Sequence, residues 1–164
     1  VVADSDFAEK VVAVVLPVNA AVVVALQYAV GRRLSARNIR PLMTFGTFCF
    51  VLGLGGFIVS DSSLLLWGLS AAVFTLGEVI YAPGEYMLID NIAPAGMKAS
   101  YFSAQSLGWL GAAFNPMITG SILTHMPHWS LFVVLMLAII VAWLMIFRGM
   151  KISPWQNGCS AVSA

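Results

Sequence analysis

Residues 64–89 read LLLWGLSAAVFTLGEVIYAPGEYMLI, an apolar stretch that contains two carboxylates, Glu78 and Glu85. The hydrocarbon core of a bilayer is crossed by roughly 20 helical residues, so this stretch is long enough to span it. A lone strand in lipid would leave its backbone N–H and C=O groups without partners, whereas a helix pairs them internally. The stretch therefore predicts a membrane-spanning helix.

The composition of the whole chain supports this prediction. Of the 164 residues, 60% are hydrophobic and 9% are charged, and the mean hydropathy is +0.93. A soluble domain carries about 25% charged residues, which cover its surface. We therefore expect the outer surface to face lipid. The net charge is +1, and no basic tract is long enough to indicate nucleic acid as a partner.

Four further segments have the length and apolarity of a membrane span. The five predicted spans are residues 11–30, 42–60, 64–89, 101–124 and 131–147. The ten-residue alternation of apolar and polar side chains that marks a membrane barrel is absent from the sequence. We predict an all-α membrane protein with a helical bundle at residues 1–147. Residues 148–164 are predicted to be a disordered cytoplasmic tail.

The basic residues lie in alternate connections. All 8 Lys and Arg residues except Lys10 fall in residues 31–41, residues 90–100 and the tail. Because Lys and Arg stay on the cytoplasmic side, these three segments are predicted to be cytoplasmic and the N-terminus periplasmic. The chain begins with Val1 and no signal sequence is recognisable, so we expect further spans upstream.

Glu78 lies about two thirds of the way through its span toward the cytoplasm, at 1.5 Å per helical residue. An ionisable group at this depth costs on the order of 3 kcal/mol on insertion scales and normally faces protein or water. Two interpretations stand equally: a functional residue, as proton carrier or substrate contact, and a structural carboxyl bonded to a neighbouring helix.

Glu85 lies on nearly the same helical face as Glu78, with Tyr81 between them. It is closer to the cytoplasmic interface, where a hydrated or paired carboxylate costs little, so a structural role is favoured. Pro83 and Gly84 separate the two carboxylates and predict a kink in the helix, and Pro116 predicts a kink in the fourth span.

Three amides lie within predicted spans: Asn19, Gln105 and Asn115, the last followed by Pro116. Each needs a partner in the bilayer, which either a polar transport path or a neighbouring helix could supply. Glycines should allow close helix packing in the second and fourth spans; these are Gly53, Gly55, Gly56, Gly108, Gly111 and Gly120.

No pattern in the sequence indicates an enzyme or a metal site. His125 and His128 have no Cys or carboxylate nearby and are expected to be surface residues. No Ser-His-Asp or Cys-His set falls at one membrane depth.

Residues 77–98 read GEVIYAPGEYMLIDNIAPAGMK. Pro83 in the helix, followed by Asp90, Pro94 and Lys98 at the cytoplasmic exit, resembles the tenth-helix signature of drug/proton antiporter-type exporters of the major facilitator superfamily. Residues 108–116, GWLGAAFNP, are similar to the Gly- and Pro-rich eleventh helix of that family.

The loop LSARNIRP, residues 34–41, resembles the family's loop between helices eight and nine. The usual pattern has an acidic residue before the Arg and a Gly two residues after it. Ala36 and Ile39 occupy those places here. The resemblance therefore does not carry over a charge relay through that acid.

The resemblance implies that the chain is a C-terminal fragment, helices eight to twelve of a twelve-helix fold in the bacterial inner membrane. It implies proton-coupled export of small molecules, such as drugs, small peptides or related metabolites, by alternating access of two halves. The implied partners are the lipid bilayer, the substrate and the missing helices one to seven. The proton gradient would supply the energy without a cofactor.

The same resemblance implies two groups of functional residues. The expected substrate and proton pathway is lined by Glu78, Tyr81, Asn115, Gln105 and Asn19. The expected cytoplasmic gate consists of Arg37, Arg40, Asp90, Lys98 and Glu85.

Two alternatives remain open on the sequence. The chain could be a truncated or accessory membrane protein that does not transport, and an upstream reading frame with seven more spans would argue against this. It could also belong to an uptake symporter of the same fold, since no residue reports the direction of coupling.

Overall fold

The computed structural model describes residues 2–35, 38–94 and 96–152, which form helices and short connections. In chain order the helices are α1 (Val2–Arg33), α2 (Ile39–Val59), α3 (Leu64–Ile92), α4 (Lys98–Ser106), α5 (Gly108–His125) and α6 (Trp129–Ile152). Four of them, α1, α2, α3 and α6, are long and apolar enough to cross a membrane. The prediction of an all-α membrane protein is confirmed.

Side chains in the connections fix where the helices begin and end. The Ser63 hydroxyl accepts a hydrogen bond from the Leu66 N–H at 3.4 Å and so caps the start of α3. After α1, the Asn38 side-chain amide donates to the Arg33 carbonyl at 2.6 Å, and its oxygen accepts from the Ser35 N–H at 2.8 Å. Both connections give otherwise unpaired helix-end groups a partner.

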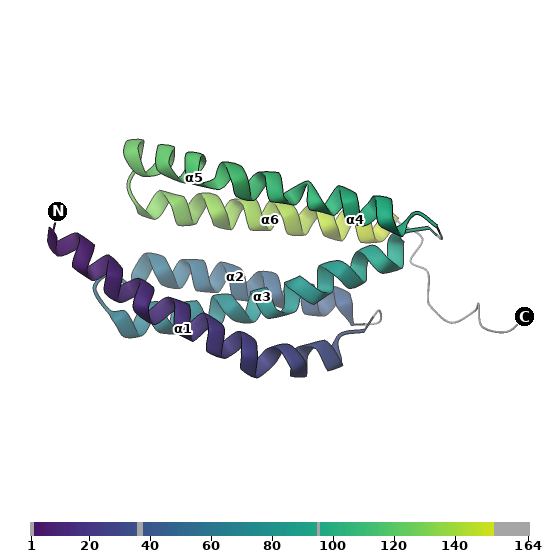
Figure 1. Ribbon diagram of the computed structural model, residues 1–164, viewed down its shortest axis with the longest axis horizontal. Coiled ribbons are helices and arrows are strands. Elements are labelled where there is room, and N and C mark those ends of the chain that lie inside the picture. The colour runs from purple at the N-terminus through teal and green to yellow at the C-terminus, as the bar shows by residue number, and fades with distance from the viewer. Residues whose placement is uncertain (1, 36–37, 95, 153–164) are drawn as a thin grey trace, which may run out of the picture.

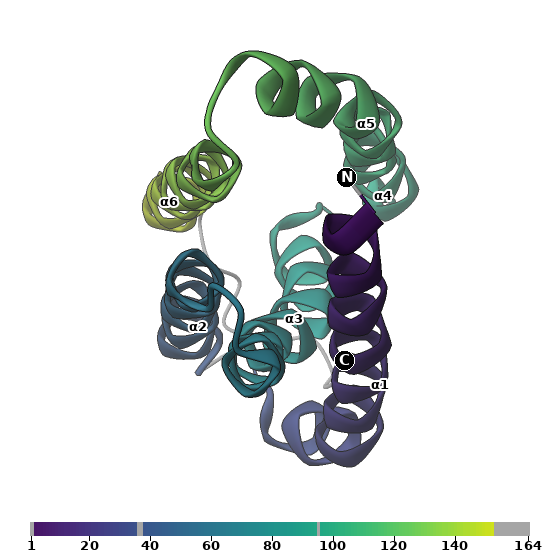
Figure 2. The same cartoon turned by 90° about the vertical axis from the view of Figure 1, so that its left-hand side faces the viewer.

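Helix α3 lies at the centre of the packing. It contacts α1 on one side and α2 on another, and α6 packs against α2 (Figure 2). Helices α4 and α5 follow one another along the upper edge of Figure 1, and neither has a buried residue within the described chain.

The interface between α2 and α3 depends on glycines, which have no side chain to keep the two helices apart. A Cβ atom on Gly53 would lie 2.7 Å from the Phe74 Cβ, and one on Gly56 would lie 2.3 Å from the Ser70 Oγ. A Cβ on Gly77 would lie 2.7 Å from the backbone oxygen of Gly46. These contacts are shorter than any real Cβ makes, so α2 and α3 approach this closely only because glycine occupies these places.

The prediction of close packing holds for two of the three glycines in the second predicted span and for none of the three in the fourth. Gly53 and Gly56 make the expected close contacts, but no outside atom lies within 4 Å of the place a Cβ would occupy at Gly55. The same is true of the three glycines of the fourth predicted span, Gly108, Gly111 and Gly120. The prediction of close packing at those three positions is therefore wrong among the described helices, because α5 lies on the outside of them.

Two apolar clusters join α6 to the rest of the bundle. At one end, a buried cluster contains Ile39, Met43, Leu88 and Met150. At the other end, the Phe132 ring lies 5.9 Å from the Phe57 ring, centre to centre. The two clusters hold α6 along the length of α2.

The fourth predicted span differs in detail from the structure. The sequence predicts one helix over residues 101–124, whereas in the structure this helix is interrupted at Leu107, between α4 and α5. Neither α4 nor α5 is among the four helices that have the length and apolarity of a membrane span. Helices α1 and α6 extend beyond the predicted spans, to Val2 and to Ile152.

The basic segments lie at the same end of the bundle. The end of α1, the start of α2, the α3–α4 connection and the end of α6 all lie at the right of Figure 1. The connections α2–α3 and α5–α6 lie at the opposite end. This alternation agrees with the grouping of basic residues read from the sequence.

Replacing Gly53 by Ala should destabilise the protein by about 1–3 kcal/mol, because the added methyl group overpacks the contact with Phe74. Gly55→Ala is the matched control, since its Cβ would enter open space. The measurement is the free energy of unfolding of the intact gene product in mixed detergent micelles titrated with SDS. Equal stability of the two variants would contradict the close packing of α2 on α3.

Candidate functional site

A polar contact joins α1 to α3 in the middle of both helices. The Asn19 side-chain amide donates to the Glu78 carboxylate at 2.8 Å and to the Thr75 hydroxyl at 2.9 Å. The Thr75 hydroxyl in turn donates to the Ala71 carbonyl one turn earlier in its helix, at 2.8 Å. Two residues of the predicted pathway, Asn19 and Glu78, are therefore in direct contact.

Glu78 is exposed within the described chain, while Thr75 is buried and Asn19 is half-buried. One side of the carboxylate is held by α1, and the other side faces away from the packed helices. In a hydrocarbon environment a carboxylate with one neutral partner remains costly. The geometry therefore suits a group that meets water, a substrate or further protein on its open side.

Tyr81 points to a different neighbour. Its hydroxyl lies 3.1 Å from the Thr47 hydroxyl of α2, and its ring centre lies 5.4 Å from that of Phe50. Thr47 is buried and also donates to the Met43 carbonyl. Within this chain Tyr81 belongs to the α2–α3 interface and not to the contact around Glu78.

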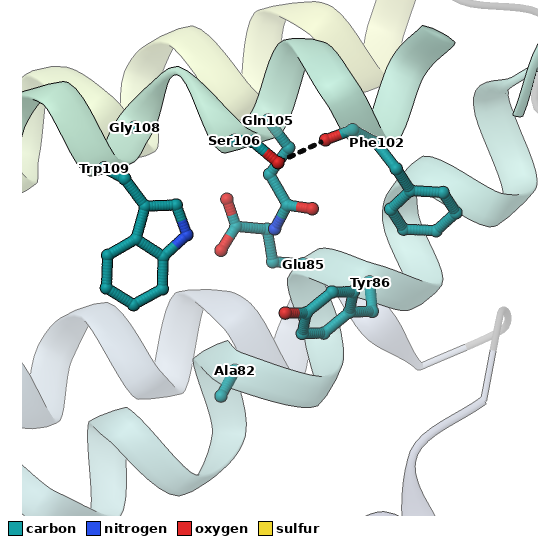
Figure 3. Close-up of a pocket in the computed structure, with 8 residues that line it drawn as sticks. All are labelled: Ala82, Glu85, Tyr86, Phe102, Gln105, Ser106, Gly108 and Trp109. Carbon is teal, nitrogen blue, oxygen red and sulfur yellow. Dashed lines mark hydrogen bonds between the residues drawn. The ribbon is translucent and has the colours of Figure 1, made fainter. Parts of the chain in front are cut away.

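A cavity of about 400 Å³ lies between α3 and the α4–α5 pair (Figure 3). Glu85 and Gln105 extend into the same space from opposite sides, and Trp109 lies beside them. Tyr86 and Phe102 close one side, with ring centres 6.0 Å apart. Among the described residues, no side chain forms a hydrogen bond or an ion pair with the Glu85 carboxylate.

The structure thus divides the predicted pathway into separate places. Asn19 and Glu78 meet at the α1–α3 contact, Gln105 lines the cavity together with Glu85, and Tyr81 binds α2. Asn115 accepts a hydrogen bond from the Thr119 hydroxyl of its own helix at 3.1 Å.

The predicted kink residues lie inside helices that continue through them. Pro83 and Gly84 are in α3, and the part of α3 beyond them rises toward α4 in Figure 1. Gly84 is buried with the Met43 side chain close by, so it also serves packing. Pro116 lies inside α5.

Three of the predicted gate residues make contacts at the basic end of the bundle. Asp90 and Lys98 form an ion pair across the α3–α4 connection, with both side chains about half exposed. The Arg40 guanidinium of α2 donates to the Met150 carbonyl near the end of α6. Arg37 lies outside the described residues.

Sequence reasoning missed several residues around these sites. Thr75 precedes Glu78 by one helical turn, and this spacing could have placed it beside the carboxylate. Trp109, Tyr86 and Phe102 line the cavity, but aromatic residues are common in apolar spans and carry no signal of their own. Only the approach of α4 to α3 brings them together.

Four helices long and apolar enough to cross a membrane, with a polar contact between two of them, are the features of a multi-pass membrane protein. The chain is 71% identical over 155 residues to YdeE of Escherichia coli (strain K12), an MFS-type transporter, and this match covers 94% of the chain. It is 29% identical over 115 residues to YqjV of Bacillus subtilis (strain 168), also an MFS-type transporter. The chain belongs to the major facilitator superfamily.

The matches cover only part of each relative. The chain spans 39% of the length of YdeE, and the aligned part is 27% of YqjV. No family model and no solved structure matches the chain. The resemblance to the superfamily read from residues 77–98 is confirmed, and the similarity extends specifically to YdeE.

The open cavity predicts that a cysteine at position 85 will react with a charged, water-soluble thiol reagent. The test uses Glu85→Cys in the intact gene product with Cys49 and Cys159 replaced by Ala. Leu88→Cys is the control, because Leu88 lies on the same helix but is only 9% exposed, within the packed core. Labelling is followed by mass spectrometry; equal labelling of both positions would contradict a cavity beside Glu85.

Proposed function

We propose that this chain supplies helices eight to twelve of a twelve-helix secondary transporter that exports small molecules in exchange for protons. The similarity to two MFS-type transporters supports membrane transport in general. The contact of Asn19 with Glu78 across α1 and α3 is the observation that carries the proton-coupled form of the proposal.

In this proposal Glu78 carries the proton. The ionised carboxylate accepts the Asn19 N–H, and this bond ties α1 to α3. Protonation converts one carboxyl oxygen into a donor and weakens its demand for the amide. The contact between α1 and α3 thereby becomes dependent on the proton, which is what coupling to a helix movement requires.

The cavity beside Glu85 is the proposed substrate contact. Glu85 offers a carboxylate without a partner among the described residues, Gln105 an amide that both donates and accepts, and Trp109 an aromatic surface. Ligand sites in proteins are largely apolar with a few polar groups that fix orientation. Drugs, small peptides and related metabolites have this mixed chemistry.

The remaining features of the proposal concern the setting. The basic end of the bundle would lie on the cytoplasmic side of a bacterial inner membrane, and the N-terminus would lie on the periplasmic side. Helices one to seven would supply the second half that alternating access needs, and the proton gradient would supply the energy without a cofactor or enzymatic step.

Glu78→Gln in the intact gene product should abolish the dependence of transport on the pH gradient, because the amide cannot carry a proton. Proteoliposomes with an imposed pH gradient, assayed across a panel of substrates, provide the measurement. Glu9→Gln is the matched control, since Glu9 is an exposed carboxylate near the start of α1.

Unchanged pH-driven transport in Glu78→Gln would remove Glu78 from the mechanism. Movement of the substrate in the same direction as the protons would favour the symporter alternative. No transport of any substrate class by the intact gene product would favour an accessory membrane protein.

The ion pair of Asp90 and Lys98 is the proposed gate contact and tests the gate separately. Asp90→Asn should change stability by less than about 1 kcal/mol, because both side chains are half exposed. It should change turnover more than substrate affinity. The double exchange Asp90→Lys with Lys98→Asp should restore turnover, measured in the same proteoliposomes; unchanged turnover in Asp90→Asn would contradict a gating role.

A further inference from the structure

A second cavity, of about 560 Å³, lies between α1 and the part of α3 around its proline. Helices α1 and α3 pack against each other and then separate toward this end of the bundle (Figure 1). Its lining comes from the end of α1 and the middle of α3: Gln27, Tyr28, Gly31, Arg32, Ala82, Pro83 and Tyr86. Nothing in the proposed transport path uses the α1 side of this cavity.

The cavity has a basic rim. The Arg32 guanidinium carbon lies 5.5 Å from the centre of the Tyr28 ring, a cation–π distance that holds the side chain beside the opening. An adjoining hollow of about 340 Å³ is lined by Tyr28, Ala29, Arg32 and Arg33. The ion pair found in the described part of the chain joins Asp90 to Lys98, so no described carboxylate neutralises Arg32 or Arg33.

The depth of the cavity matches the headgroup level of a membrane. The apolar run of α1 ends at Val30, and Arg32 and Arg33 form its last turn. Tyrosine is enriched where the hydrocarbon core meets water, and Tyr28 and Tyr86 both line this cavity. Gly31, Ala82 and Pro83 add an apolar wall to the cavity.

We propose that this cavity binds an anionic phospholipid, with the headgroup phosphate at Arg32 and Arg33 and the glycerol and upper acyl chain against Gly31, Ala82 and Pro83. Guanidinium groups bind phosphate oxygens through paired hydrogen bonds. Basic pockets between membrane helices on the cytoplasmic side recognise such headgroups. A free anion would use the arginines but gain nothing from the apolar wall, which favours the lipid.

The test is native mass spectrometry of the intact gene product in detergent, with phosphatidylglycerol or phosphatidylcholine added. Phosphatidylglycerol should be retained more than phosphatidylcholine, and Arg32→Gln should lower its retention about fivefold, as expected for one basic residue near an anionic surface. Arg148→Gln is the charge-matched control, because Arg148 is exposed on α6 and lies outside the cavity. Equal losses in both variants would overturn the proposal.

A second variant tests the apolar wall without changing charge. Gly31→Leu places a side chain where a Cβ meets no atom within 4 Å, so it should fill the cavity without disturbing the fold. It should lower retention of phosphatidylglycerol while leaving the elution volume on size exclusion unchanged. Full retention in Gly31→Leu, or displacement of the lipid by millimolar inorganic phosphate, would show a site for free anions only and overturn the lipid assignment.

Discussion

Lipid offers no hydrogen-bond partner, and this constraint governs the structure. Backbone groups pair within helices. Several polar side chains in the spans return to their own helix, as the Ser60 hydroxyl does to the Gly56 carbonyl at 2.7 Å, and others reach a neighbour, as Asn19 does. Since the apolar side chains gain little by leaving lipid for protein, these polar bonds and the close glycine contacts decide which helices associate.

Helix α3 collects both kinds of contact. On the α2 side it packs through Gly53 and Gly77, and on the α1 side it is bonded through Glu78. Its second half separates two cavities, and Ala82 and Tyr86 line both of them. Whatever occupies either cavity therefore contacts the same turn of α3, next to the proline inside the helix.

The α4–α5 pair forms the open side of the described helices. Trp109 and Met117 are 78% and 76% exposed, and α5 has no buried residue. The unused glycines Gly108, Gly111 and Gly120 lie on this same element. In the proposed twelve-helix architecture these small residues would face the helices of the other half, which suits the close approach that glycine allows.

The sequence by itself determined the helical membrane class, the grouping of basic residues at one end and the superfamily, because apolar length, charge placement and motifs are local properties of the chain. It also indicated Glu78 as a residue that needs a partner. Only the tertiary structure decided that the partner is Asn19, that Tyr81 turns to Thr47, and that Glu85 shares a cavity with Gln105. Those choices depend on how each helix is rotated and how closely it approaches its neighbours, which no single segment encodes.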